Sequence, residues 1–165
     1  MSKALEDLKA AFAGESQANR RYLAFAQKAD EEGHAQVAKL FRAAAAAETV
    51  HAHNHLRAMD GVKTTAENLE EAISGESHEV LNMYPAMIEH AEAEGNKRAE
   101  TSFKWAWEVE KTHEALYRKA QEALGKEAES FDYWVCQVCG HTHERQAPDK
   151  CPVCGAPAGR FERVA

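Results

Sequence analysis

The sequence ETVH at residues 48–51 recurs as EKTH at residues 110–113, 62 positions further along the chain. In both copies a glutamate precedes a histidine by three residues, so on a helix the two side chains share a face, one turn apart. One such pair is commonly a charged surface feature. Two copies at matched positions instead predict that two helices present the same pair of metal-ligand side chains.

Shorter matches show that the repeat extends beyond these motifs. GES at residues 14–16 recurs at residues 75–77, an offset of 61, whereas EG at residues 32–33 recurs at residues 94–95, an offset of 62. The change of offset indicates one residue inserted in the second copy. The chain therefore contains a duplicated helical hairpin.

The residues up to 129 have the composition and periodicity of helices. They are rich in Ala, Glu, Leu, Lys and Arg, and apolar residues recur at spacings of three and four. Thr64 and Glu67 have the form of a capping box that opens the third helix. Pro85 is expected to kink this helix, because it removes a hydrogen bond to the carbonyl of Leu81. The stretches are separated by four glycines: Gly33, Gly61, Gly95 and Gly125. The pattern predicts two antiparallel hairpins that form a four-helix bundle.

Carboxylates interrupt the apolar stripes on all four predicted helices. Counted from the glycine turns, they lie at similar heights along antiparallel helices, within about one turn of one another. Burying so many carboxylates together is prohibitive unless cations neutralise them. The five are Glu15, Glu48, Glu76, Glu79 and Glu110.

His51 and His113 complete the two Glu-x-x-His pairs. A glutamate on each of two helices, with Glu-x-x-His on each of the other two, is the pattern of ferritin-like dinuclear carboxylate proteins. Oxygen ligands with one imidazole for each metal suit iron or manganese. The sequence therefore predicts a dinuclear metal site within the bundle.

The residues after 129 form a different unit. Two Cys-x-x-Cys-Gly motifs contain all four cysteines of the chain, with eleven residues between the second cysteine and the third. Four thiolates at this spacing predict a tetrahedral site for one iron or zinc ion rather than disulfides. The ligands are Cys136, Cys139, Cys151 and Cys154. We expect a helical domain over residues 1–129 and a metal-binding domain over residues 130–165, which is too small to fold on an apolar core alone.

The composition excludes several classes of protein. The 165 residues carry 27 acidic and 20 basic side chains, a net charge of -7, so a nucleic-acid partner is not expected. Mean hydropathy is -0.60 and no apolar run is long enough to span a membrane. The charged N-terminal residues do not resemble a signal stretch, so we expect a cytoplasmic protein without membrane association.

The chain resembles the rubrerythrin family over its whole length. The resemblance rests on residues 14–18 (GESQA), residues 83–85 (MYP), residues 94–95 (EG) and the paired Cys-x-x-Cys motifs with their neighbouring aromatic residues. It implies an all-α, ferritin-like diiron four-helix bundle followed by a small rubredoxin-like Fe(Cys)4 domain.

The resemblance also implies roles for individual residues. Glu15, Glu48, Glu76, Glu79 and Glu110 would supply carboxylates, with Glu48 and Glu110 bridging both irons, and His113 would be a permanent ligand. His51 and Glu79 resemble a pair that exchange on one iron with its oxidation state. Glu79 has no counterpart in the first repeat, where Ala18 stands. By spacing, Tyr22 and Tyr84 lie about two turns after Glu15 and Glu76, close to the same helix faces. They are either core aromatic residues without a special role or catalytic groups that orient the carboxylate ligands and help to retain bound peroxide.

The function implied is that of a non-haem diiron peroxidase. Such an oxidoreductase reduces hydrogen peroxide to water and protects against oxidative stress, and the rubredoxin-like centre relays electrons to the diiron site. An external donor, either a rubredoxin or an NAD(P)H-dependent reductase, would supply them, because the chain has no Gly-x-Gly-x-x-Gly motif. A homodimer or higher homo-oligomer, arranged head to tail, is implied by the resemblance alone.

Two other functions fit parts of the sequence. A ferritin-like iron oxidase or iron-handling protein would use dioxygen or ferrous iron, but it needs no thiolate site for electron entry. A zinc-ribbon interaction module on a structural helical bundle would leave the carboxylates in the apolar stripes unexplained. The residue pattern alone leaves open iron against zinc at the cysteines and iron against manganese in the bundle.

Overall fold

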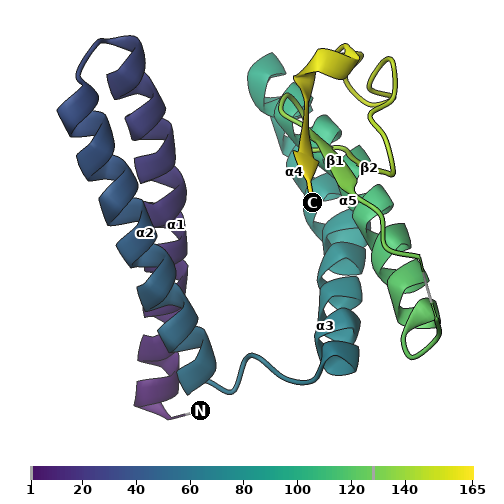
Figure 1. Ribbon diagram of the computed structural model, residues 1–165, viewed down its shortest axis with the longest axis horizontal. Coiled ribbons are helices and arrows are strands. Elements are labelled where there is room, and N and C mark those ends of the chain that lie inside the picture. The colour runs from purple at the N-terminus through teal and green to yellow at the C-terminus, as the bar shows by residue number, and fades with distance from the viewer. Residues whose placement is uncertain (1, 128) are drawn as a thin grey trace. The chain divides into compact units, whose positions relative to one another are not determined.

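The computed structural model describes residues 2–127 and 129–165. The chain divides into two compact units, of which the first ends at Lys63 and the second begins at Thr64 (Figure 1). The first contains α1 (Lys3–Glu31) and α2 (Ala35–Ala58). The second contains α3 (Thr65–His78), the π-helix η1 (Glu79–Met83), α4 (Tyr84–Ala93), α5 (Lys97–Ala123), and a small sheet domain. The sheet domain comprises β1 (Tyr133–Cys136), β2 (Thr142–Glu144), the 3-10 turn η2 (Ala158–Arg160) and β3 (Phe161–Val164).

The first unit is an antiparallel hairpin built on small residues. Ser2 caps α1 by accepting a hydrogen bond from the Leu5 amide at 3.3 Å. Gly33 ends the helix at φ +81°, a left-handed conformation that favours glycine, and α2 follows at once. The buried residues of the hairpin are all alanines: Ala26, Ala29, Ala38, Ala45 and Ala52. Small side chains allow the two helix backbones to pack closely, while the larger apolar side chains of Val37 and Leu40 remain exposed.

The second hairpin begins with the capping box that the sequence predicts. The Thr64 hydroxyl accepts from the Glu67 amide, and the Glu67 carboxylate accepts from the Thr64 amide at 3.1 Å. Gly95 forms the turn to α5 at φ +67°. Ile73, Ile88, Ala91 and Val109 form the buried apolar positions between the helices.

The third predicted helix contains a π-helical segment in place of a simple kink. In this register Tyr84 donates its amide hydrogen to the carbonyl of Glu79, five residues back. Pro85 has no amide hydrogen, so the carbonyl that it leaves free is that of Val80 rather than that of Leu81 as predicted. The indole nitrogen Nε1 of Trp107 donates to this Val80 carbonyl at 2.8 Å. The π-helix lies where the repeat offset changes from 61 to 62, so it accommodates the inserted residue.

The sheet domain has strand order β2-β1-β3, with antiparallel pairing throughout. Cys136, Cys151 and Phe161 form its small core, with Trp134 packed against them. The predicted fold class, helical hairpins followed by a small cysteine-bearing domain, is confirmed. The boundary between residues 129 and 130 stays a prediction. Within the described residues, the helices lack the combination of length and apolar character needed to span a bilayer.

Candidate metal centres

The first unit brings Glu15 of α1 together with Glu48 and His51 of α2. Their potential ligand atoms all lie within 4.8 Å of one another. Nδ1 of His51 lies 2.9 Å from Oε2 of Glu48, the contact expected of a Glu-x-x-His pair on one helical turn. The Glu48 side chain is mostly buried, whereas His51 is largely exposed.

The second unit forms the matching cluster from Glu76 of α3 with Glu110 and His113 of α5. These ligand atoms also lie within 4.8 Å of one another. Nδ1 of His113 lies 2.7 Å from Oε2 of Glu110 and 3.9 Å from Oε1 of Glu76. Each hairpin thus holds a cluster of two carboxylates and one imidazole, as the repeat predicts.

The second cluster has the electrostatics of a site that attracts cations. Burial, together with repulsion from Glu110, raises the pKa of Glu76 to about 7. The hydrogen bond to Glu110 and the surrounding carboxylates raise the pKa of His113, against the effect of burial. A cation between these side chains would replace the proton that Glu76 retains and relieve the repulsion.

Glu79 and Tyr84 lie beside the second cluster without belonging to its closest group. Burial and the charge of Glu110 raise the pKa of Glu79, which is at the start of the π-helix. Burial and the charges of Glu79, Glu110 and Glu76 raise the pKa of Tyr84. The Tyr84 hydroxyl therefore stays protonated at neutral pH and is able to donate a hydrogen bond toward the carboxylates.

Tyr22, the repeat partner of Tyr84, packs against two aromatic rings. Its ring lies 6.4 Å from that of Phe25 and 6.1 Å from that of Phe41, in tilted contacts. Tyr84 also has an aromatic neighbour, Phe103, at 6.4 Å. The two tyrosines therefore occupy matched packing positions beside aromatic rings, and Tyr84 also lies near the carboxylates of the second cluster.

The four cysteines converge in the sheet domain. Their sulfur atoms lie within 4.8 Å of one another, with 3.7 Å between the Sγ atoms of Cys136 and Cys154 and 3.5 Å between those of Cys139 and Cys151. A tetrahedral ion with bonds of about 2.3 Å separates its sulfurs by about 3.8 Å, whereas a disulfide requires about 2.05 Å. The sulfur spacing fits a single tetrathiolate ion.

Backbone amides adjust the thiols within this site. Burial raises the pKa of Cys139. At Cys151 burial also acts against ionisation, but hydrogen bonds from the amides of Cys154 and Val153, with thiol contacts, lower the pKa overall. The motif glycines turn the chain back at φ +85° for Gly140 and +78° for Gly155. These turns direct amides toward sulfur, an arrangement that stabilises thiolates on a metal.

Two contributing residues escaped the sequence analysis. Trp107 satisfies the Val80 carbonyl in the π-helix, and Thr142 of β2 places its hydroxyl oxygen 2.9 Å from Nε2 of His113. Neither belongs to a recognisable motif. Two features of the sequence could have drawn attention to them. Trp107 is a tryptophan within a predicted helix that no motif explains, and Thr142 is a polar residue close to a cysteine motif.

The donor sets define a class of protein: a diiron-carboxylate protein with paired helical hairpins and a tetrathiolate iron domain. The family model described as rubrerythrin matches residues 6–121, and the model described as the rubrerythrin rubredoxin-like domain matches residues 134–162. The chain belongs to the rubrerythrin family.

Similar proteins support this membership over nearly the whole chain. Rubrerythrin-2 of Clostridium acetobutylicum is 33% identical, with 94% of this chain and 93% of that protein covered. Rubrerythrin of Porphyromonas gingivalis is 36% identical, with 98% and 90% covered. Nigerythrin of Nitratidesulfovibrio vulgaris is 34% identical, with 95% and 84% covered.

A solved structure of nigerythrin in its fully reduced, all-ferrous state is also similar. It has a TM-score of 0.60 at 32% identity and covers 99% of this chain and 88% of that one. The family supports a peroxidase-type diiron oxidoreductase with a rubredoxin-like domain, peroxide as substrate and a donor such as rubredoxin. The donor sets fit two irons among the carboxylates and one at the cysteines.

Proposed function

We propose that this chain reduces hydrogen peroxide to water with electrons that enter at the four cysteines. The observation that carries the proposal is the presence, in one chain, of two Glu-Glu-His clusters and a tetrathiolate site. Each turnover consumes one peroxide, two electrons and two protons, and yields two water molecules. When bound, the iron pair supplies the two electrons for cleavage of the oxygen–oxygen bond.

The ligand assignment is part of the proposal. Glu15, Glu48 and His51 would hold one metal ion, and Glu76, Glu110 and His113 would hold the other. Glu48 and Glu110, each beside the histidine of its own helix, would be the carboxylates available to both ions. The support is the equal composition of the two clusters, since equal donor sets suit two metal ions of the same kind.

Tyr84 and Glu79 are proposed as the groups that act beside the ligands. Tyr84 keeps its proton, because its pKa is raised, and donates a hydrogen bond to the peroxide. Glu79 and His51 would be alternative ligands of one metal, with the carboxylate preferred by a ferric ion and the imidazole tolerated by a ferrous ion. By the repeat, Tyr22 is proposed to play the same part beside the first cluster, with its ring packed against Phe25 and Phe41.

We also propose a source for these electrons. An NAD(P)H-dependent reductase, acting directly or through a rubredoxin, would feed the four-cysteine centre. A homodimer or higher homo-oligomer and a cytoplasmic location also stay predictions. Sedimentation of the iron-loaded protein would test the first, and fractionation of its native cells would test the second.

Peroxide consumption under anaerobic conditions tests the proposed function. Iron-loaded protein, reduced in advance, is mixed with hydrogen peroxide, and in a separate arm with dioxygen and excess ferrous iron. We expect rapid loss of peroxide and slow reaction in the second arm. Faster oxidation and accumulation of added ferrous iron than loss of peroxide would instead favour the ferritin-like iron oxidase.

A further inference from the structure

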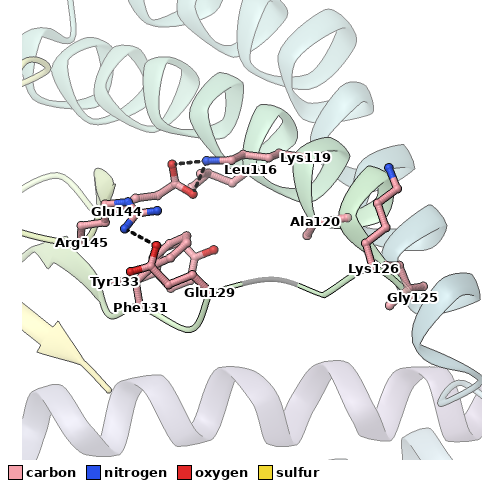
Figure 2. Close-up of a pocket in the computed structure, with 12 residues that line it drawn as sticks. Leu116, Lys119, Ala120, Gly125, Lys126, Glu129, Phe131, Tyr133, Glu144 and Arg145 are labelled. Carbon is pink, nitrogen blue, oxygen red and sulfur yellow. Dashed lines mark hydrogen bonds and ion pairs between the residues drawn. The ribbon is translucent and has the colours of Figure 1, made fainter.

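One face of β2 is attached to α5 at two points. Thr142 and Glu144 are two residues apart on the strand, so their side chains project to the same side. The Thr142 hydroxyl meets Nε2 of His113 at 2.9 Å. Nζ of Lys119 lies 2.8 and 2.6 Å from the two carboxylate oxygens of Glu144. Figure 2 draws these two contacts as dashed lines. The four-cysteine domain therefore touches the helix that carries the second Glu-x-x-His pair.

The two nitrogens of His113 face different partners. Nδ1 faces the carboxylates of Glu110 and Glu76, so it is the nitrogen available to a metal in this cluster. Nε2 contacts the Thr142 hydroxyl directly, beside a pocket that is otherwise lined mainly by apolar side chains, among them Leu69 and Leu116. A metal-ligating histidine is generally oriented by a hydrogen bond from its second ring nitrogen.

A threonine hydroxyl suits this position because it both accepts and donates. With Nδ1 bound to a metal, Nε2 carries the ring proton and donates it to the Thr142 oxygen. The hydroxyl hydrogen then has an acceptor in the Gly140 carbonyl, 3.4 Å away. Gly140 directly follows Cys139, and its amide donates to the Cys136 carbonyl at 2.8 Å. The Thr142 hydroxyl thus joins the turn that carries Cys136 and Cys139 to His113 of the second carboxylate cluster.

We infer that Thr142 is a positioning residue for His113, through which the folded four-cysteine domain strengthens metal binding at the second carboxylate cluster. The inference rests on the proposed metal role of His113 and is independent of the peroxidase reaction. It makes the two metal sites energetically coupled, because a domain that folds on its own metal carries the orienting hydroxyl.

Manganese binding to the full chain tests this inference without any turnover. The cysteines are first filled with zinc, and Mn²⁺ is then titrated while free Mn²⁺ is followed by electron paramagnetic resonance. Thr142→Val keeps the shape of the side chain but removes the hydroxyl. We expect about a tenfold loss of affinity for one of the two Mn²⁺ ions, with the other unaffected. Thr142→Ser is expected to restore the wild-type affinity.

Glu144→Gln is the matched control, because it alters the same face of β2 but leaves the hydroxyl. Its ion pair with Lys119 is largely exposed on the lysine side and contributes little, so Mn²⁺ affinity is expected to change by less than about threefold. Equal losses in Thr142→Val and Glu144→Gln, or failure of Thr142→Ser to restore binding, would assign the effect to domain docking and overturn the inference.

Removing the zinc site gives a second readout. Cys139→Ala is expected to lower the affinity for the same Mn²⁺ ion. Adding Thr142→Val in that background is expected to change the affinity little, because both substitutions remove the same hydrogen bond between Thr142 and His113. Fully additive losses would overturn the coupling. If the wild type binds two Mn²⁺ ions and Thr142→Val binds them with the same affinity, the role of Thr142 is overturned but the carboxylate site is not. A wild type that binds no Mn²⁺ would overturn the proposed carboxylate site as well.

Discussion

At the scale of one residue, Glu76 illustrates the electrostatic repulsion within a carboxylate cluster that a bound metal ion would relieve. Its pKa in the folded protein is about 7, against 4.5 as the ordinary value, because it is partly buried and faces Glu110. Its neighbours Glu79 and His113 act in opposite directions, the first raising and the second lowering this pKa. The folded protein therefore binds this proton more tightly than the unfolded chain.

This shift predicts how the stability of metal-free protein depends on pH. The contribution of Glu76 is fully present below pH 4.5 and is lost as pH rises from there through about 7. We expect Glu76 to account for a loss of about 1–2 kcal/mol over that window, allowing for partial solvent screening. Glu76→Gln should remove this part of the slope, measured by urea unfolding at several pH values. Glu71→Gln, an exposed change on the same helix, serves as control, and identical slopes in all three proteins would contradict the account.

Glu79 and His51 provide a second test at this scale. Glu79→Ala should leave both irons bound in the reduced protein and impair the oxidised state, because a ferric ion loses its additional anionic oxygen. His51→Ala should weaken the reduced state most. Iron content and crystal structures of both redox states are the measurements. An identical ligand set at the same iron in each state of the wild type would rule out exchange.

At the scale of secondary structure, the π-helix distinguishes the turn that begins at Glu79 from the α-helical turn at Ala18, its equivalent in the first repeat. The inserted residue widens one turn between α3 and α4, and Glu79 begins that turn. Pro85 and the π-helical register together leave the Val80 carbonyl to Trp107. The turn is thus held by a hydrogen bond from the neighbouring helix.

This account predicts an interaction between Trp107 and Pro85. Trp107→Phe removes the donor and should cost about 1–3 kcal/mol of unfolding free energy, because the Val80 carbonyl loses its partner. Pro85→Ala supplies a backbone amide and should recover part of that loss in the double variant. Urea unfolding of all four proteins measures the coupling. Strictly additive effects would show that the two residues do not serve the same carbonyl.

At the scale of secondary structure, the sequence predicts helix caps and turns better than changes in the hydrogen-bond register of a helix. The capping box at Thr64 and the glycine turns follow from short-range spacing, and the structure contains both. The π-helix was not predicted, because one inserted residue barely alters an apolar periodicity that averages over several turns. The burial of alanines instead of Val37 and Leu40 also depends on close helix packing, which spacing alone does not reveal.

At the scale of the whole molecule, metal ions are expected to supply much of the stability. Ions that bind only the folded chain stabilise it by about 2.7 kcal/mol for each site at a free concentration of 100 Kd. Chelation should therefore lower the melting temperature, most steeply for the four-cysteine domain. Calorimetry of metal-free and reloaded protein checks this, and equal melting temperatures would count against all three metal positions.

Contacts between residues that are far apart in the chain could not be predicted from the sequence. The Glu-x-x-His pairs and the cysteine motifs are visible because each is local, and the repeat relates distant copies of one pattern. Thr142 reaches His113 only because β2 lies against α5, a contact between residues 29 positions apart. The spacing of the motifs does not predict that β2 packs against α5. The contact between the four-cysteine domain and the second carboxylate cluster therefore became visible only in the structure.

The stoichiometry of peroxide consumption is the most direct test of the claim that the two metal sites work as one enzyme. With two irons at the carboxylates and one at the cysteines, a fully reduced chain holds three electrons. Without an external donor it should consume about 1.5 equivalents of hydrogen peroxide, and Cys139→Ala, with its helical domain still loaded, about one. With a donor, only the wild type should turn over repeatedly. Equal consumption by the two proteins, or undiminished steady turnover in Cys139→Ala, would contradict electron entry through the four-cysteine centre.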